Sequence, residues 1–340
     1  MKYNTSLKVK QRNVGLELLR GLLCFWVIIF HFLTPANAFT SSVKSKRYHV
    51  PCFFFISFFY LYSTIKDKNI LKMKLRLQRI IIPYLIWPLI IFIINNALFL
   101  LFENNQFHNI LALYDLKIQL LVGRKFMSHL WFMFHLLFLS IFFFILSLLF
   151  NIDAFLFCST MIMILSYIIQ YSGCNYNFFI EYKGSIKHSL GYLVESLPFI
   201  ISAFFFSSYD VIKYLKIHRI KTFIICLMLL FLLIKYQIFA DLEGFGYRGV
   251  DKNLVSILLF IEFYFIPFEY LNENVLYFLN NFLRYTQGIY CLQFFSSYLV
   301  SLLIHEKHTL ISCFLIYIIG YLISFFGMNI FNKYKLKYLF

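Results

Sequence analysis

Apolar segments of about the length needed to cross a lipid bilayer recur from one end of this chain to the other. A helix of about 20 apolar residues spans the hydrocarbon core of a membrane. The chain is 61% hydrophobic and only 14% charged, whereas a soluble domain carries about 25% charged residues. This apolar surplus exceeds what a water-soluble core can bury. The sequence therefore predicts an all-α integral membrane protein that crosses the bilayer many times.

Ten segments carry this pattern, and we expect about ten transmembrane helices. They cover residues 14–34, 50–65, 81–102, 129–150, 154–172, 190–209, 221–239, 253–271, 285–304 and 310–331. No long polar insert separates them, which predicts one membrane-embedded domain over residues 1–340 and no soluble accessory domain. The largest basic run, from Lys66 to Arg79, lies on the same side as the N-terminus if every segment crosses. Because cytosolic loops carry the excess of Lys and Arg, we expect both termini in the cytosol.

The net charge of +16 has the same explanation. In a soluble protein it would indicate nucleic-acid binding. Here the basic residues lie between apolar segments, and no basic helix or zinc-finger spacing is present. We therefore expect a lipid bilayer as the surroundings and no nucleic-acid partner.

The first apolar segment permits a second interpretation. Basic residues precede the apolar run 21–33, and Ala36-Asn37-Ala38 follows it, as in a cleavable signal peptide. Glu17 and Arg20 interrupt the approach to the apolar run and argue against cleavage. We expect a retained helix, with the signal peptide as the alternative.

Ionisable residues inside this first segment are candidates for function, because charges are costly in a bilayer. Eleven residues separate Arg20 from His31, which is close to three helical turns, so both side chains share a face about 16 Å apart along the axis. Glu17 lies one turn before Arg20 on nearly the same face. With the N-terminus inside, one stripe places a cation near the cytosol and an imidazole near the outer surface. The alternative is that both side chains snorkel to the headgroups.

A second pair of cations opens the third apolar segment. Arg76 and Arg79 are three residues apart and share a helix face. Paired guanidinium groups suit phosphate recognition. Ordinary positive charge at the inner surface is the competing interpretation.

Several short motifs resemble those of the membrane acyltransferase-3 family. The resemblance lies in Glu17, Arg20 and Gly21 followed by His31; in Val50-Pro51 through Ser57; in Arg76-x-x-Arg79 before Pro83-Tyr84; in His129-Leu130-Trp131-Phe132; and in Gly288-Ile289-Tyr290. Their order and spacing cover nearly the whole chain. The resemblance implies a polytopic O-acyltransferase of the plasma or inner cell membrane, typically acting on cell-surface carbohydrate.

The resemblance also assigns roles to the candidate residues. Acetyl-CoA is the implied acyl donor, the acceptor is a hydroxyl of an extracytoplasmic polysaccharide or glycolipid sugar, and no metal is implied. Arg76 and Arg79 would bind the anionic donor, and Arg20, counted with His31 among the catalytic residues, would line the same passage. His31 would be the catalytic base, a task that suits an imidazole at neutral pH. Candidate supporting residues are Glu17, Ser57, Trp131, Glu195 and Glu262.

Two alternatives keep other functions open. Phe58 stands where the family usually has glycine, and Gln293 stands where a late histidine is common. These two departures allow a non-catalytic relative. A third difference, Glu17 in place of the usual aspartate, is conservative. A many-pass transporter or polymerase for lipid-linked sugars is the other alternative. The orienting partner of His31 and the choice between direct transfer and a covalent acyl-enzyme stay open at this point, as does the oligomeric state.

Overall fold

The structure of the chain is a computed structural model. It describes residues 13–34, 48–102, 113–122, 130–171, 186–208, 211–239, 250–266, 268, 271–283, 285–303 and 309–333. The Ala36-Asn37-Ala38 segment, His129 and both chain ends lie outside these residues.

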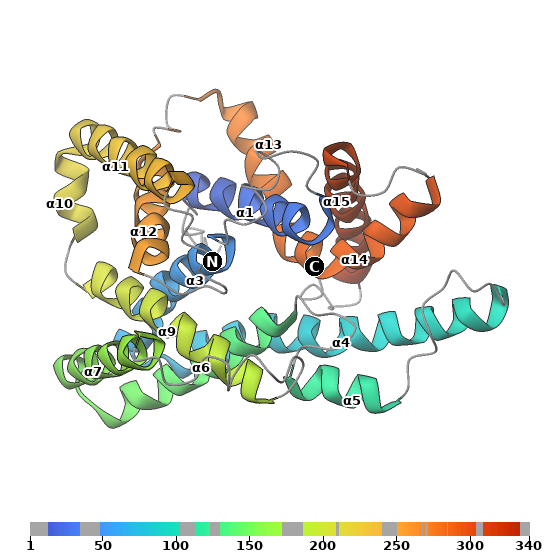
Figure 1. Cartoon of the computed structure of the whole chain (residues 1–340), viewed down its shortest axis with the longest axis horizontal. Helices are drawn as coiled ribbons and strands as arrows, with labels where there is room; N and C mark the ends of the chain where they lie inside the picture. Colours follow the sequence, from blue (N-terminus) through green and yellow to red (C-terminus); the bar gives the residue numbers. More distant parts are fainter. Residues whose placement is uncertain are drawn as a thin grey trace, which may run out of the picture.

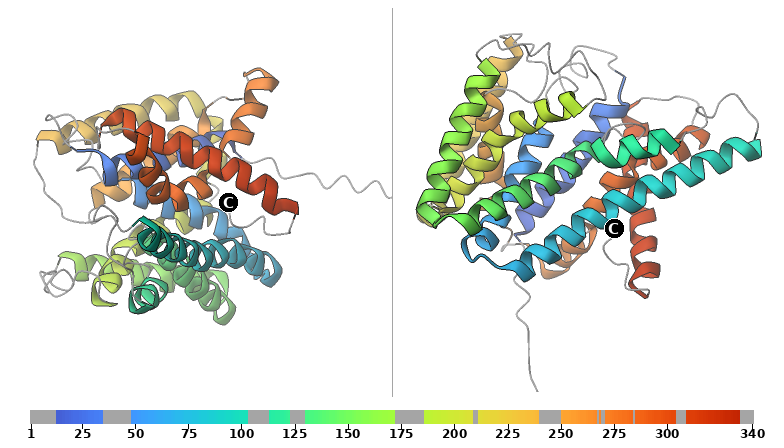
Figure 2. Two further views of the ribbon diagram at one scale, coloured as in Figure 1. Left: turned by 90° about the vertical axis from the view of Figure 1, so that its right-hand side faces the viewer. Right: turned by 90° about the horizontal axis from the view of Figure 1, so that it is seen from below.

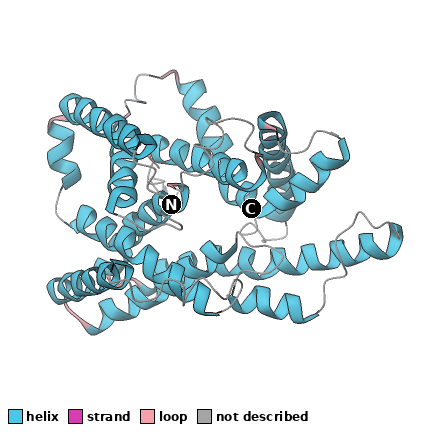
Figure 3. Cartoon of the chain, viewed as in Figure 1, coloured by secondary structure: helices cyan, strands magenta, loops and turns pink. Residues whose placement is uncertain are grey.

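Every regular element in the described part of the chain is a helix (Figure 3). The helices are α1 (Val14–Phe32), α3 (His49–Lys66), α4 (Ile70–Phe102), α5 (Leu113–Val122), α6 (Trp131–Leu149), α7 (Ile152–Tyr171), α9 (Ile186–Ser208), α10 (Val211–Ile217), α11 (Arg219–Phe239), α12 (Val250–Phe265), α13 (Glu273–Leu283), α14 (Thr286–Leu303) and α15 (Leu310–Lys333). The predicted all-α class is thereby confirmed.

Six helices within the described ranges are long and apolar enough to cross a membrane. These spans are Val14–Phe32, Ile70–Ile94, Trp131–Leu149, Ile152–Gln170, Gly191–Ser208 and Leu310–Met328. The chain is thus a multi-pass membrane protein. Each of the ten predicted segments overlaps a helix of the structure, but the number ten and the cytosolic termini stay predictions.

Three helix boundaries and connections differ from expectation. Helix α4 begins at Ile70, eleven residues before the predicted span, so the arginine pair lies inside the helix. Helix α12 ends at Phe265 and not near residue 271, because Pro267 disfavours helical backbone in the residue before it. The loops between the predicted spans contain the short helices α5, α10 and α13.

The helices form two groups with α3 between them (Figures 1 and 2). Neighbour contacts link α4, α5, α6, α7 and α9 in one group and α1, α11, α12, α13, α14 and α15 in the other. Helix α3 contacts α4, α6 and α9 on one side and α1 and α12 on the other. Accordingly, 13 of its 18 residues are buried.

Helix α1 is fixed at its start against the end of α12. The side-chain oxygen of Asn13 accepts a hydrogen bond from the Leu16 backbone N–H at 3.0 Å, which caps the helix. The Asn13 side-chain amide donates to the Tyr264 carbonyl at 3.1 Å. Gly15 faces the Phe263 carbonyl so closely that a Cβ atom there would overlap it. The first turn of α1 therefore packs directly on the α12 backbone.

Candidate functional site

The predicted stripe on α1 lies on one continuous helix. Arg20 and His31 both fall inside α1, which runs unbroken from Val14 to Phe32. At 100° and 1.5 Å per residue, they differ by about 20° in direction and about 16 Å in height. Near the N-terminal end, Arg20 forms an ion pair with Glu17 at 3.3 Å. The Glu17 carboxylate is 7% exposed and the Arg20 side chain 35%.

Arg76 forms the most connected polar group near this end of α1. Its Nη2 donates to Ser57 Oγ on α3 at 3.0 Å, and its Nε donates to Ser140 Oγ on α6 at 3.4 Å. The Phe58 ring lies 5.8 Å from the guanidinium carbon, within the range of a cation–π contact. Both serines are buried, whereas the arginine is partly exposed. One guanidinium thus joins α3, α4 and α6.

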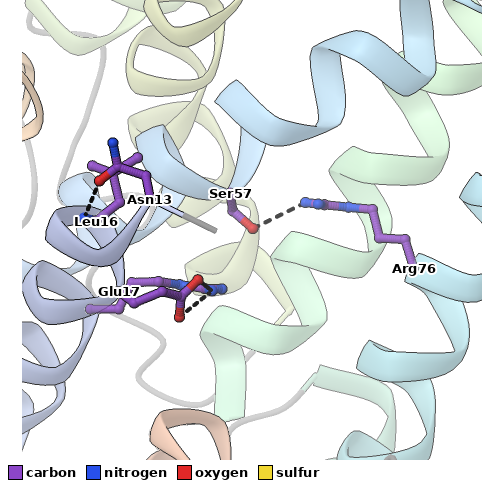
Figure 4. A network of polar contacts seen from close by, with 6 residues as sticks. Asn13, Leu16, Glu17, Ser57 and Arg76 are labelled. Carbon is purple, nitrogen blue, oxygen red and sulfur yellow. Dashed lines mark hydrogen bonds and ion pairs between the residues drawn. The ribbon is translucent and has the colours of Figure 1, made fainter. Parts of the chain in front are cut away.

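Positive charge gathers around this guanidinium. The charges of Arg20 and Arg79 are both close enough to act on Arg76 electrostatically. Figure 4 shows the Arg76 guanidinium reaching Ser57, with the Glu17 carboxylate on the other side of Ser57. Because Glu17 balances one of the three arginines, the cluster retains an excess of positive charge that suits an anionic ligand.

Helix α14 also contacts the segment of α4 that carries the arginines. The side-chain amide of Gln287, in the first turn of α14, donates to the Arg79 carbonyl at 2.7 Å. Close by, the Cys24 thiol of α1 donates to the Thr286 carbonyl at 3.3 Å. The start of α14 is therefore attached to both helices that carry the arginines.

The surroundings of His31 are aromatic. Its ring lies 5.2 Å from that of Phe30 and 5.7 Å from that of Phe294 on α14, measured between centroids. Phe30 in turn lies 5.3 Å from His49, a buried residue in the first turn of α3. His31 is partly exposed. The imidazole therefore lies against Phe294 of α14, at the end of α1 opposite Arg20.

Trp131 and Glu195 lie on neighbouring faces of α6 and α9. The Trp131 ring stacks on Tyr192 with centroids 4.6 Å apart and also lies 5.2 Å from His135. Glu195 is 4% exposed and follows Tyr192 by one helical turn, on the same face of α9. The Trp131–Tyr192 pair is thus next to the buried His135, and Glu195 lies one turn along α9 from Tyr192.

Glu262 lies at the other end of the bundle from His31. It precedes Phe263 and Tyr264, the two residues whose carbonyls meet the first turn of α1. It is 5% exposed, its charge acts on the Cys226 thiol of α11, and its Oε1 has no hydrogen-bond partner within the described residues. This position makes Glu262 unsuited to orienting His31.

The two departures from the family pattern have different surroundings. Phe58 is fully buried among the rings of Phe54, Phe143 and Phe204. Its ring also contacts the guanidinium of Arg76. Its ring fills space that a glycine would leave and adds a contact to the arginine.

Gln293 is instead buried near the contact between α14 and α15. Ile289 and Ser296, one turn before and after it on the same face, are the residues that approach Gly320 of α15. Gln293 is 1% exposed, and its Nε2 has no hydrogen-bond partner among the described residues. Gln293 therefore lies between the face of α14 that meets α15 and Tyr290, whose ring packs on Phe53 of α3 and Phe132 of α6.

Sequence reasoning missed Ser140 and Gln287. Lone serines in apolar helices commonly bond to their own backbone, so Ser140 gave no signal of its own; only its position opposite Arg76 identifies it. Gln287 stands beside the glycine-tyrosine motif of residues 288–290, and its polar side chain at a helix start was the available signal. No three metal-binding side chains gather in the part of the chain that the structure describes.

Comparison with known families places these residues in one matched region. A family model described as an acyltransferase domain, Acyl_transf_3, matches residues 13–338. Comparison with curated proteins and with solved structures gives no significant match. The match includes α1 with Glu17, Arg20 and His31, and it extends over essentially the whole chain. The chain therefore belongs to the membrane acyltransferase-3 family.

Proposed function

We propose that this acyltransferase is an O-acetyltransferase that uses cytosolic acetyl-CoA to acetylate a sugar hydroxyl outside the cytoplasm. In the net reaction, the thioester C–S bond breaks and a C–O ester bond forms. The hydroxyl proton ends on the thiol of the released CoA. The acceptor is a polysaccharide or a glycolipid of the cell envelope.

The observation that carries the proposal is the arginine cluster at one end of α1 with an imidazole on the same stripe at the other end. The donor is anionic through its phosphates, and the cluster around Arg76 has excess positive charge. Guanidinium groups bind phosphate through paired N–H donors. Arg76 and Arg79 are therefore the proposed donor-binding residues, and Arg20 lines the passage that leads away from them.

His31 is the proposed catalytic base. An acceptor hydroxyl is a weak nucleophile until a base takes its proton, and histidine suits that role at neutral pH. The aromatic rings around His31 also resemble surfaces on which sugars stack. The partly exposed imidazole would take the hydroxyl proton as the oxygen attacks the acetyl carbonyl.

The assignment of the donor to the arginines and of the acceptor to His31 implies a membrane topology. The proposed protein spans the cell membrane ten times with both termini in the cytosol, as a single domain without a soluble addition. The basic residues at the start of α4 then face the compartment that contains acetyl-CoA. His31 faces the compartment that contains the acceptor.

Reconstitution tests the proposal directly. Purified protein in liposomes receives acetyl-CoA labelled in the acetyl group on the arginine-bearing side and a polysaccharide acceptor on the other side. We expect label in the polysaccharide as alkali-labile ester, and loss of surface-glycan acetyl groups after deletion of the gene. Absence of acetyl-CoA binding together with unchanged glycan acetylation would instead favour transport of lipid-linked sugars or a non-catalytic role.

A further inference from the structure

The hydrogen bonds of Arg76 occupy one particular edge of its guanidinium. An arginine side chain offers five N–H donors in a fixed planar arrangement. Nε and Nη2 share one edge, and these are the atoms that donate to Ser140 and Ser57. Nη2 has a second hydrogen, and Nη1 has no protein partner among the described residues, so the edge formed by Nη1 and Nη2 still offers N–H donors. That free edge can hold two oxygens of one phosphate side by side.

Three buried groups fix the plane of this guanidinium. Ser57 is 9% exposed and Ser140 is fully buried, so neither hydroxyl is replaced readily by water. The Phe58 ring packs on the same guanidinium and is itself fixed among buried aromatic rings. Because the three groups come from α3 and α6, the direction of the free edge is set by helices other than the one that carries Arg76.

We propose that Ser140, together with Ser57, is a positioning residue that aims the free edge of Arg76 at a phosphate of the acyl-CoA donor. The inference rests on the proposed function, because it assigns these serines to the donor site. Neither serine touches the donor. Each removes rotational freedom from the guanidinium before the donor arrives, and such preorganisation strengthens binding.

A structural role alone would give a different result. If the serines served only to join α3, α4 and α6, their loss would lower stability and leave donor affinity unchanged. If they position Arg76, their loss weakens acetyl-CoA binding, because the guanidinium then contributes less to the affinity. Lysine at position 76 lacks Nε and the planar fork, so in that background Ser140 has no guanidinium edge to aim.

A double-mutant cycle on the purified full-length protein distinguishes these cases. Acetyl-CoA affinity is measured by calorimetric titration for the wild type, Ser140→Ala, Arg76→Lys and the double variant, and Ser57→Ala provides a second test. We expect Ser140→Ala to weaken binding about tenfold, as loss of a hydrogen bond to a charged group does. In the Arg76→Lys background, we expect Ser140→Ala to change affinity less than about twofold.

The matched control is Ser147→Ala on the same helix. Ser147 is buried, and its hydroxyl donates to the Phe144 carbonyl of its own helix at 2.7 Å. We expect this variant to bind acetyl-CoA as the wild type does, with thermal unfolding used to compare stability. Equal loss from Ser140→Ala in both backgrounds, or no loss in either while Arg76→Ala binds weakly, overturns the positioning role alone. A wild type that does not bind acetyl-CoA overturns the proposed function as well.

Discussion

The two ends of α1 stabilise their functional groups in opposite ways. At the start, Glu17 pairs with Arg20, and buried serines fix the neighbouring Arg76 through charge-assisted hydrogen bonds. At the far end, His31 stands among aromatic rings from α1 and α14. A phosphate-binding end needs several charges held in place, whereas a base that gains and loses a proton needs room for its substrate. The difference between the ends matches the division into donor and acceptor sides.

The comparison depends most on His31. We expect His31→Ala to lower acetyl transfer by about 10²- to 10⁴-fold, because a positioned base contributes that much. Acetyl-CoA affinity should stay close to that of the wild type, because the imidazole is at the other end of the helix. Labelled transfer and calorimetric titration measure the two effects separately. His218→Ala, in the turn between α10 and α11, is the control, and full activity of His31→Ala would remove this residue from the mechanism.

Arg76 tests the donor end. We expect Arg76→Ala to raise KM for acetyl-CoA by about 10- to 100-fold, since charged hydrogen bonds contribute about 1.5–3 kcal/mol. Steady-state kinetics with varied acetyl-CoA measures this change. Lys74→Ala provides the matched control, because Lys74 is an exposed cation on the same helix. An equal rise in KM for both variants would show that overall charge, and not the held guanidinium, attracts the donor.

Gly15 tests how far the donor end relies on close packing of α1 against α12. A Cβ atom at this position would overlap the Phe263 carbonyl, so Gly15→Ala must displace one helix. Such overpacking costs about 1–3 kcal/mol of stability. Thermal unfolding of the solubilised protein measures the loss. Leu22→Ala, at an exposed position of the same helix, should unfold close to the wild type, and an unshifted Gly15→Ala would show that the contact is readily relaxed.

Ionic strength gives the smallest expected effect. Raising salt from about 0.1 M to 1 M shortens the screening length from about 10 Å to about 3 Å. KM for acetyl-CoA should rise severalfold, because the partly exposed arginines attract the donor through water. The rate constant kcat should change little, because the described contacts of His31 are with aromatic rings. A fall in kcat with constant KM would show that salt acts at the His31 end and not at the arginine end of α1.

Much of the fold follows from patterns that depend on single segments. Apolar length and helical period located α1 from residue 14 and placed Arg20 and His31 on one face, because both features belong to one helix. The start of α4 could not be located in this way. Its first turns carry the basic residues Lys72, Lys74, Arg76 and Arg79, which read as a cytosolic loop when apolar content is the criterion.

Contacts between helices could not be predicted from the sequence. Ser140 is identified only by its contact with Arg76, which requires α6 to lie against α4. The packing of Gly15 likewise depends on the backbone of Phe263, nearly 250 positions away. The departure at Gln293 is a related case. Its effect on function depends on which neighbour it meets, and the structure buries it between residues that approach α15 and Tyr290, which packs on α3 and α6.

The burial of α3 has a consequence for how the protein enters the membrane. This helix is enclosed by both helix groups, and it is not among the six described helices apolar and long enough to span on their own. Ser57 and His49 of this helix are buried against protein and do not face acyl chains. We therefore expect the insertion machinery to release α3 into the lipid only together with a neighbour such as α4, so that assembly of the two groups begins during synthesis of the chain.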